Sequence, residues 1–99
     1  MNQMQQMLMN AQRMQRELQK AHAALDAKEF HVSKNGMVDL TMMGNRTIKS
    51  LVIDKDALDP ENAEMLTEAI TLALNEALEA IEAENDAIEE RVTGKNGLF

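Results

Sequence analysis

Residues 4–28 read MQQMLMNAQRMQRELQKAHAALDAK, and their apolar side chains recur at alternating steps of three and four residues. This spacing is a heptad seam, which keeps one stripe of a helix facing a partner helix. No Gly or Pro interrupts the stretch, most of its residues favour helix, and the Asn2 side chain can cap the first turn. The pattern therefore predicts one helix over residues 2–28. Its seam consists of Met4, Met7, Ala11, Met14, Leu18, Ala21 and Leu25.

This predicted helix is long for a small globule. A helix of roughly 25 residues extends about 37 Å, whereas a compact domain of about 100 residues has a radius of gyration of only about 13 Å. We therefore expect the helix to protrude and a long partner element to lie along it. The candidate contacts of this dimer or helix seam are Met4, Met7, Met14, Leu18 and Leu25.

Three basic residues fall together on the side of the same helix that lies opposite the seam, when residues are placed about 100° apart. They are Arg13, Arg16 and Lys20. Such a stripe can simply solvate an exposed helix face, or it can contact an anionic partner.

Residues 29–54 change to an alternating apolar and polar pattern, which is typical of strands with one buried face. Asn35-Gly36 separates two alternating runs and predicts a hairpin, because a type I′ turn needs positive φ at both central residues. Gly44-Asn45 predicts the next turn, before a third strand over residues 46–53. The segment therefore predicts a three-stranded antiparallel meander. Its edge strands would have unpaired backbone groups that can pair with a second chain.

A second long helix is predicted over residues 59–93, because Asp59-Pro60 combines a capping residue with a proline in the first turn. Leu58, just before it, is expected to pack against the sheet. Gly94 is placed to end the helix with a left-handed residue, and residues 94–99 form a predicted tail whose Phe99 can dock. The element order predicts an α+β fold (α-β-β-β-α) in a single domain, residues 1–99.

The composition limits the class of protein. The 99 residues include no Cys, no Trp, no Tyr and only two Phe, so there is no disulfide framework and little aromatic area for a core. A modest core beside a long apolar seam favours an oligomer. No segment has the apolar run of a signal peptide or a membrane span, so we expect a cytoplasmic protein that does not bind membranes.

The formal net charge of -7 is distributed unevenly along the chain. Residues 54–99 hold thirteen acidic residues against three basic ones, whereas residues 1–53 carry a small net positive charge. This asymmetry indicates a face for an anionic partner or for self-association. The acidic residues expected on the outside of the second helix are Glu68, Glu76, Glu79, Glu82, Glu84, Asp86, Glu89 and Glu90.

No pattern indicates catalysis or a bound cofactor. Met4 and Met7 could suggest a soft copper site, but methionine at seam positions more often fills irregular packing. A di-iron bundle needs Glu-x-x-His pairs, and neither His22 nor His31 has a Glu three residues before it. Phosphate-loop, nucleophile-elbow and calcium-loop motifs are missing from the sequence. We expect no metal, no cofactor, no small-molecule substrate and no enzymatic activity.

Several stretches match a known family when they are taken together. They are Met4 to Leu18 (MQQMLMNAQRMQREL), Asn35-Gly36-Met37-Val38, Leu51-Val52-Ile53-Asp54, Asp56-Ala57-Leu58 and Glu64-Met65-Leu66. On these residues the chain resembles the YbaB/EbfC family of bacterial nucleoid-associated proteins. The resemblance implies a tweezer-like homodimer whose sheets meet centrally and whose helices project as arms.

The same resemblance implies a function. It implies cytoplasmic, nucleoid-associated binding of double-stranded DNA, largely without sequence specificity, with a change in DNA conformation. Arg13, Arg16 and Lys20 become candidate phosphate contacts. The weaker candidates for DNA binding are Lys28, Lys34, Arg46 and Lys49.

The sequence departs from the family pattern near the end of the second helix. Other members carry more basic residues there, whereas this chain has the acidic region from Glu79 to Glu90. An acidic arm repels phosphate. The alternative function is therefore a protein-interaction adaptor, in which acidic helical arms hold a basic or helical protein with little or no DNA binding.

Overall fold

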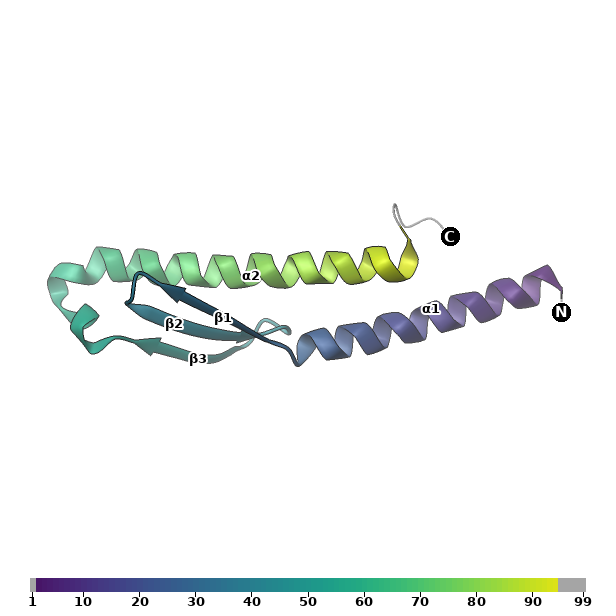
Figure 1. Ribbon diagram of the computed structural model, residues 1–99, viewed down its shortest axis with the longest axis horizontal. Helices are drawn as coiled ribbons and strands as arrows, with labels where there is room; N and C mark the ends of the chain where they lie inside the picture. Colours follow the sequence, from purple (N-terminus) through teal and green to yellow (C-terminus); the bar gives the residue numbers. More distant parts are fainter. Residues whose placement is uncertain (1, 95–99) are drawn as a thin grey trace.

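The computed structural model describes residues 2–94 and places a three-stranded sheet between two long helices in the chain order (Figure 1). The α+β class and the α-β-β-β-α order are confirmed. The predicted tail, apart from Gly94, lies outside the described residues, and so does the expected docking of Phe99. The elements are α1 (Gln3–Asp26), β1 (Glu29–Lys34), β2 (Val38–Met43), β3 (Ile48–Ile53) and α2 (Ala63–Thr93), with 3₁₀ turns at Lys55–Leu58 and Pro60–Asn62.

A capping box begins α1. The Gln5 backbone N–H donates to Asn2 Oδ1 at 2.8 Å, and the Asn2 backbone N–H donates to Gln5 Oε1 at 3.4 Å. These reciprocal bonds satisfy donors that have no partner inside the helix. The expected Asn2 cap is confirmed, and the helix then runs for 24 residues before Ala27 caps its end.

The sheet is an antiparallel meander in the order β1-β2-β3. Phe30 lies opposite Met42, and Lys34 lies opposite Val38. Between β1 and β2, Asn35 has φ of 55° and Gly36 has φ of 66°, which are the positive values that a type I′ hairpin requires. The first predicted turn is confirmed.

The second turn is longer than the sequence pattern suggested. Arg46 has a positive φ of 69°, and the Thr47 backbone N–H donates to Asn45 Oδ1 at 3.0 Å. Because this left-handed residue still belongs to the turn, β3 begins at Ile48 rather than at residue 46.

The core lies between α2 and the strands β1 and β2. Ala69, Ala73 and Ala77 are fully buried along the sheet-facing side of α2, and their small side chains let the helix approach the strands closely. Leu40 from the central strand and Ile81 from α2 are the largest fully buried side chains. Figure 1 shows α2 lying along one face of the sheet.

The third strand is not buried in the same way. Ile48, Leu51 and Val52 are 50%, 39% and 57% exposed. A helix is only about 10 Å wide, and neighbouring strands lie about 4.8 Å apart, so α2 covers two strands of the three. The prediction of a meander with one buried face is therefore wrong at β3. Leu58 is also 59% exposed, contrary to expectation, whereas Ala57 is buried.

The second helix begins later than predicted. The Asp59 side chain accepts from the Glu61 backbone N–H at 2.9 Å, so Asp59 does act as a cap. The turn that it caps is the 3₁₀ turn Pro60–Asn62, and α2 follows from Ala63. At the other end Gly94 ends the helix, as expected, and its φ of 84° is positive. Its ψ of 160° lies outside the left-handed helical region, so the prediction of a left-handed residue there is wrong.

Candidate nucleic-acid interface

The molecule is elongated, and its dimensions are 71 × 22 × 13 Å. In Figure 1 the N-terminal half of α1 extends beyond the end of α2. Met4 and Met7 in that half are 78% and 71% exposed. The protrusion that the helix length predicted is therefore present in the single chain.

The seam of α1 divides into two parts. Leu25 is buried, and Leu18 and Ala21 are partly buried against the cluster that contains Ile88 of α2. Met14 is partly buried, whereas Met4 and Met7 are exposed. The C-terminal part of the seam thus packs on α2 of the same chain, and the N-terminal part is left open. We call residues 3–14, the open part, the protruding half of α1.

The basic stripe consists of Arg13, Arg16 and Lys20, and all three side chains are exposed. They line one shallow hollow together with Glu17 and Gln19, so the structure brings the three predicted residues onto one surface of α1. Among the ion pairs formed by residues 2–94, none involves a residue of the stripe. Exposed cations with no carboxylate partner are available to an anionic ligand.

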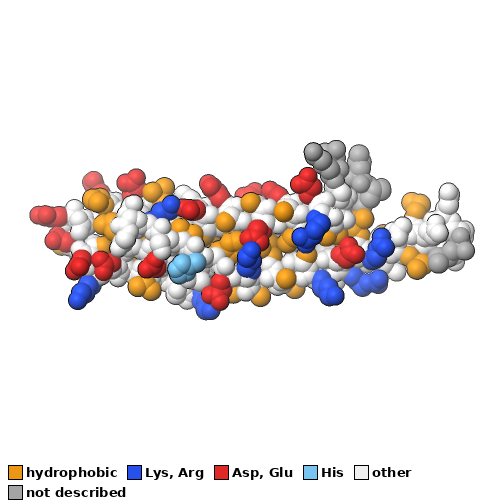
Figure 2. Space-filling view, in the orientation of Figure 1, with side chains coloured by type: hydrophobic (Ala, Val, Ile, Leu, Met, Phe, Trp, Pro, Cys, Tyr) orange, Lys and Arg blue, Asp and Glu red, His pale blue; other side chains and the backbone are white. Residues whose placement is uncertain are grey.

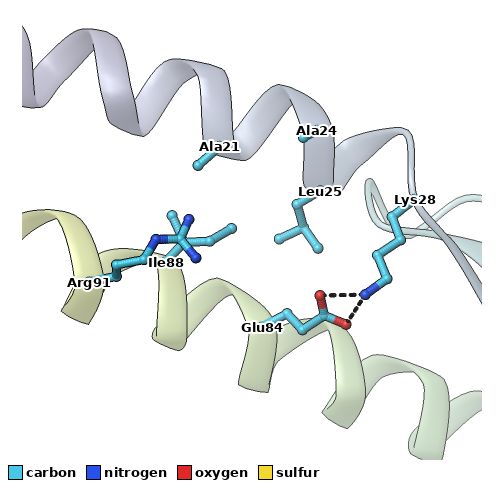
Figure 3. A pocket seen from close by; sticks show the side chains of 7 residues that line it. All are labelled: Ala21, Ala24, Leu25, Lys28, Glu84, Ile88 and Arg91. Carbon is cyan, nitrogen blue, oxygen red and sulfur yellow. Dashed lines mark hydrogen bonds and ion pairs between the residues drawn. The ribbon is translucent and has the colours of Figure 1, made fainter.

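The other predicted basic residues have different surroundings. Lys28 Nζ donates to Glu84 Oε1 at 2.7 Å and to Oε2 at 2.8 Å (Figure 3). The same ammonium lies 5.2 Å from the centre of the Phe30 ring, within the range of a cation–π contact. This pair joins the end of α1 to α2, beside a pocket in which Ile88 and Arg91 of α2 face α1 (Figure 3).

Two further lysines are also paired. Lys34 forms an ion pair with Glu76 of α2, and Lys49 of β3 pairs with Glu29 of β1 at 3.1 Å. Arg46 lies exposed in the turn before β3 and has no ion pair with any residue between 2 and 94. The structure therefore separates the stripe from Lys28, Lys34 and Lys49, whose charges are already balanced locally.

Sequence patterns did not reveal one polar contact between the helices. His22 Nε2 of α1 lies 3.3 Å from Glu89 Oε1 of α2, at an alignment that does not meet hydrogen-bond geometry. The two residues are 67 positions apart in the sequence, so only the packing of the helices brings them together. His22 and the Lys28–Glu84 pair mark the joint between α1 and α2.

The outer surface of α2 is acidic. Figure 2 shows acidic side chains along the α2 side of the molecule, whereas basic side chains are spread over the visible face and include several on the α1 side. Two of the expected outer residues, Glu76 and Glu84, bind lysines of the same chain. Those that are exposed in the described part of α2 include Glu68, Glu79, Glu82, Asp86 and Glu90.

Within residues 2–94, no helix is long and apolar enough to cross a membrane. No group of three or more His, Asp or Glu side chains in that range is placed to hold a metal ion.

Fold and surface together define an elongated α-β-β-β-α protein with an exposed basic stripe on a protruding helix. Residues 1–96 match the YbaB/EbfC DNA-binding family, and the chain belongs to this family. The resemblance noted from the sequence is therefore confirmed.

Individual relatives agree with this assignment. The chain is 43% identical over 88 residues to a nucleoid-associated protein of Enterococcus faecalis, covering 88% of this chain and 85% of that protein. It is 37% identical over 82 residues to the nucleoid-associated protein MARTH_orf159 of Metamycoplasma arthritidis, covering 83% and 85%. The fold matches the crystal structure of the uncharacterized protein HP0035 from Helicobacter pylori with a TM-score of 0.77, at 22% identity and with 95% and 99% coverage.

Proposed function

We propose that this protein is a cytoplasmic, nucleoid-associated protein that binds double-stranded DNA as a homodimer, largely without sequence specificity, and alters the conformation of the DNA. The observation that carries the proposal is the stripe of Arg13, Arg16 and Lys20, exposed on α1 and outside the ion pairs of the described residues. Membership of a DNA-binding family supports it.

The chemistry of the stripe suits phosphate. A guanidinium presents parallel N–H donors that match two phosphate oxygens, and an ammonium acts as a compact point charge. Arg13 and Lys20 are seven helical steps apart, or about 10 Å, which corresponds to about three phosphates along one strand. Phosphate contacts position the duplex and carry little sequence information.

The proposed homodimer is supported by the apolar residues that the single chain leaves exposed. Ile48, Leu51 and Val52 belong to β3, an edge strand whose backbone groups are available for pairing. Two chains joined there would carry two α1 arms on one rigid body. A duplex held by both arms would be constrained between them, which is how we propose that its path is altered.

The paired lysines take a lesser role in this proposal. Lys28, Lys34 and Lys49 would have to give up their carboxylate partners, or share them, to contact phosphate. Arg46 is exposed and lies in the turn between β2 and β3 rather than on the arm. We therefore propose Arg13, Arg16 and Lys20 as the principal contacts.

The test is a fluorescence anisotropy titration of duplex DNA at several salt concentrations. Six phosphate contacts per dimer predict a slope of about -5 in a plot of log K against log salt, and a loss of affinity of about 10³-fold between roughly 50 and 200 mM. The double variant Arg13→Glu/Arg16→Glu removes four of these contacts per dimer, so its slope should fall to about -2.

A matched variant distinguishes the effect of the stripe on DNA binding from the effect of net charge. Lys55→Glu/Arg91→Glu changes the charge of each chain by the same amount at two exposed residues outside the candidate set. It should keep the steep salt slope of the unmodified protein. Equal binding by the two double variants would show that the stripe is not the DNA site.

The exposed acidic surface of α2 favours a second candidate function. Glu79, Glu82 and Glu90 repel phosphate and could hold a basic protein instead, which is the adaptor alternative. An adaptor would bind no duplex even at about 50 mM salt, where phosphate contacts are strong. It would also retain a specific protein partner after nuclease treatment.

A further inference from the structure

The seam of α1 is covered along only part of its length. Leu18 and Ala21 pack against the core cluster together with Val92 of α2. Met4 and Met7 continue the seam at the same spacing, but they lie in the part of α1 that extends beyond the end of α2, and both side chains are exposed (Figure 1). A helix face with heptad spacing is completed by a second helix. The spacing therefore indicates a helix as the partner of the open seam.

The open seam also lines a groove of about 590 Å³, whose surface is mostly apolar. Its apolar lining consists of Met7, Ala11, Met14 and Leu18 of α1, and Thr93 of α2 closes one end. Residues 3–12 of α1 read QMQQMLMNAQ and contain no charged side chain. A highly charged helix would therefore find no opposite charges along this stretch, whereas a helix of the same uncharged composition would meet no repulsion.

We propose that the protruding half of α1 pairs with the same segment of a second copy of this chain, antiparallel and centred on residue 9. In this register Met7 lies opposite Ala11 of the second copy, and Met4 lies opposite Met14. Each central methionine thus meets a small alanine, which lets the side chains interdigitate. A parallel pair would place Ala11 opposite Ala11 and leave a void. Methionine suits this seam because its flexible side chain adapts to its neighbours.

The ends of the helices fit this register. The first residue of α1 is Gln3, which lies opposite Gln15 of the second copy. The second helix therefore covers the seam as far as Met14 and stops before Leu18, which already packs in the core of its own chain. The two copies complete one another's seams without displacing α2.

The charges on α1 favour the antiparallel direction. Arg13 stands at the rim of the groove, and in this register it lies level with the uncharged Gln5 of the second copy. A parallel pair would bring Arg13 level with Arg13, and like charges repel. Arg16 and Lys20 lie on the side of α1 opposite the seam, so pairing leaves the stripe exposed.

This pairing goes beyond the proposed function and does not depend on DNA binding. Where the proposed DNA binding also holds, one α1 pair carries the stripes of two copies and would join two segments of DNA. A seam of four residues per helix is much smaller than the interface of a stable complex. We therefore expect the association at high protein concentration.

Disulfide cross-linking tests the register, because the chain has no cysteine of its own. Met7→Cys chains labelled with ¹⁵N are mixed with unlabelled Ala11→Cys chains and oxidised, and mass spectrometry identifies which chains are joined. The antiparallel register predicts that the mixed disulfide exceeds its statistical proportion. Met9→Cys is the control, because Met9 is exposed on the side of α1 opposite the seam and should form disulfides more slowly.

Two outcomes of the cross-linking would overturn the proposal. An excess of disulfides between identical variants would show a parallel pair. Mixed disulfides that form no faster than those of Met9→Cys would show that the seams do not meet.

Sedimentation velocity at increasing protein concentration tests the association itself. The unmodified protein should show a further increase in mass at high concentration, and Met7→Glu should lose it because the pair would bury a charge. Met9→Glu adds the same charge on the opposite side of α1 and should keep the increase. Equal behaviour of the two variants would overturn the proposal.

The cross-linking also separates this pairing from the proposed homodimer through β3. Val52→Glu places a charge on β3, far along the chain from the seam. The mixed disulfide between Met7→Cys and Ala11→Cys should still form when both chains carry Val52→Glu. Its loss in that background would overturn an independent pairing of α1.

Discussion

Gly36 and Gly44 both occupy turns of the meander, but they lack a side chain for different reasons. Gly36 has a φ of 66°, and a methyl group added there would meet open space. At Gly44 a Cβ atom would lie 1.7 Å from the backbone oxygen of Leu25, and the Gly44 backbone N–H donates to Lys28 O at 2.8 Å. Gly44 therefore allows the second turn to contact the end of α1, and this contact helps to set the direction of the arm.

Gly44→Ala should destabilise the protein by about 3 kcal/mol, because a backbone carbonyl cannot move aside as a flexible side chain can. Gly36→Ala is the matched comparison. It should cost only about 1 kcal/mol, since it adds left-handed backbone strain without a clash. Urea unfolding followed by circular dichroism measures both values. Equal costs for the two substitutions would contradict the close approach at Gly44.

At the scale of elements, α2 has one face that packs on the sheet and another that carries acidic residues. Its buried face carries Ala69, Ala73 and Ala77, which permit close packing on β1 and β2, while its outer face carries exposed acids. The same helix neutralises Lys28 and Lys34 through Glu84 and Glu76. Because these lysines are paired with α2, the basic stripe on α1 is the group of exposed cations that we propose as the anion-binding surface.

Ala77→Leu should therefore be strongly destabilising, by about 3 kcal/mol, because the larger side chain forces α2 away from the sheet. Ala77 is fully buried, whereas Ala80, one turn along, is exposed. Ala80→Leu is the control and should change stability by less than about 0.5 kcal/mol. Thermal unfolding of the two variants checks the difference. A tolerated leucine at Ala77 would mean that α2 does not approach the strands as closely as described.

At the scale of the whole molecule, one chain leaves two apolar surfaces uncovered. The first is the protruding half of α1, where Met4 and Met7 are exposed, and the second is β3 with Ile48, Leu51 and Val52. The radius of gyration is 19.6 Å, against about 13 Å for a compact domain of this length. The proposed homodimer would bury this uncovered edge strand between two such extended chains.

Val52→Glu tests the proposed dimer surface. Val52 is 57% exposed in the single chain, so a charge there should leave the helix content unchanged but should disfavour burial between two chains. We expect size-exclusion chromatography with light scattering to report a monomer. Because a monomer carries one stripe instead of two, the salt slope of DNA binding should halve.

Ala83→Glu, on the exposed side of α2, adds the same charge away from the sheet and should remain dimeric. If Val52→Glu remained a dimer as well, the proposed β3 surface would be wrong.

The sequence alone determined much of the local structure of this protein, although the start of β3 and the start of α2 differ from the prediction. Helix periodicity, the Asn2 cap and the Asn35-Gly36 turn depend on interactions between residues near one another in the chain, and the structure agrees with each. The family could be recognised for the same reason, because its matching stretches are contiguous. The grouping of Arg13, Arg16 and Lys20 also follows from helix geometry alone.

Only the tertiary structure decided which surfaces are covered. The Lys28–Glu84 and His22–Glu89 contacts join residues 56 and 67 positions apart, so no local pattern reports them. The exposure of β3 and of Leu58 depends on where α2 lies over the sheet, and a single helix is too narrow to cover three strands. Gly44 was predicted as a turn residue. The reason that no side chain fits there is the backbone of Leu25, which belongs to another element. Such properties arise from distances between distant parts of the chain, and those distances are fixed only when the elements pack.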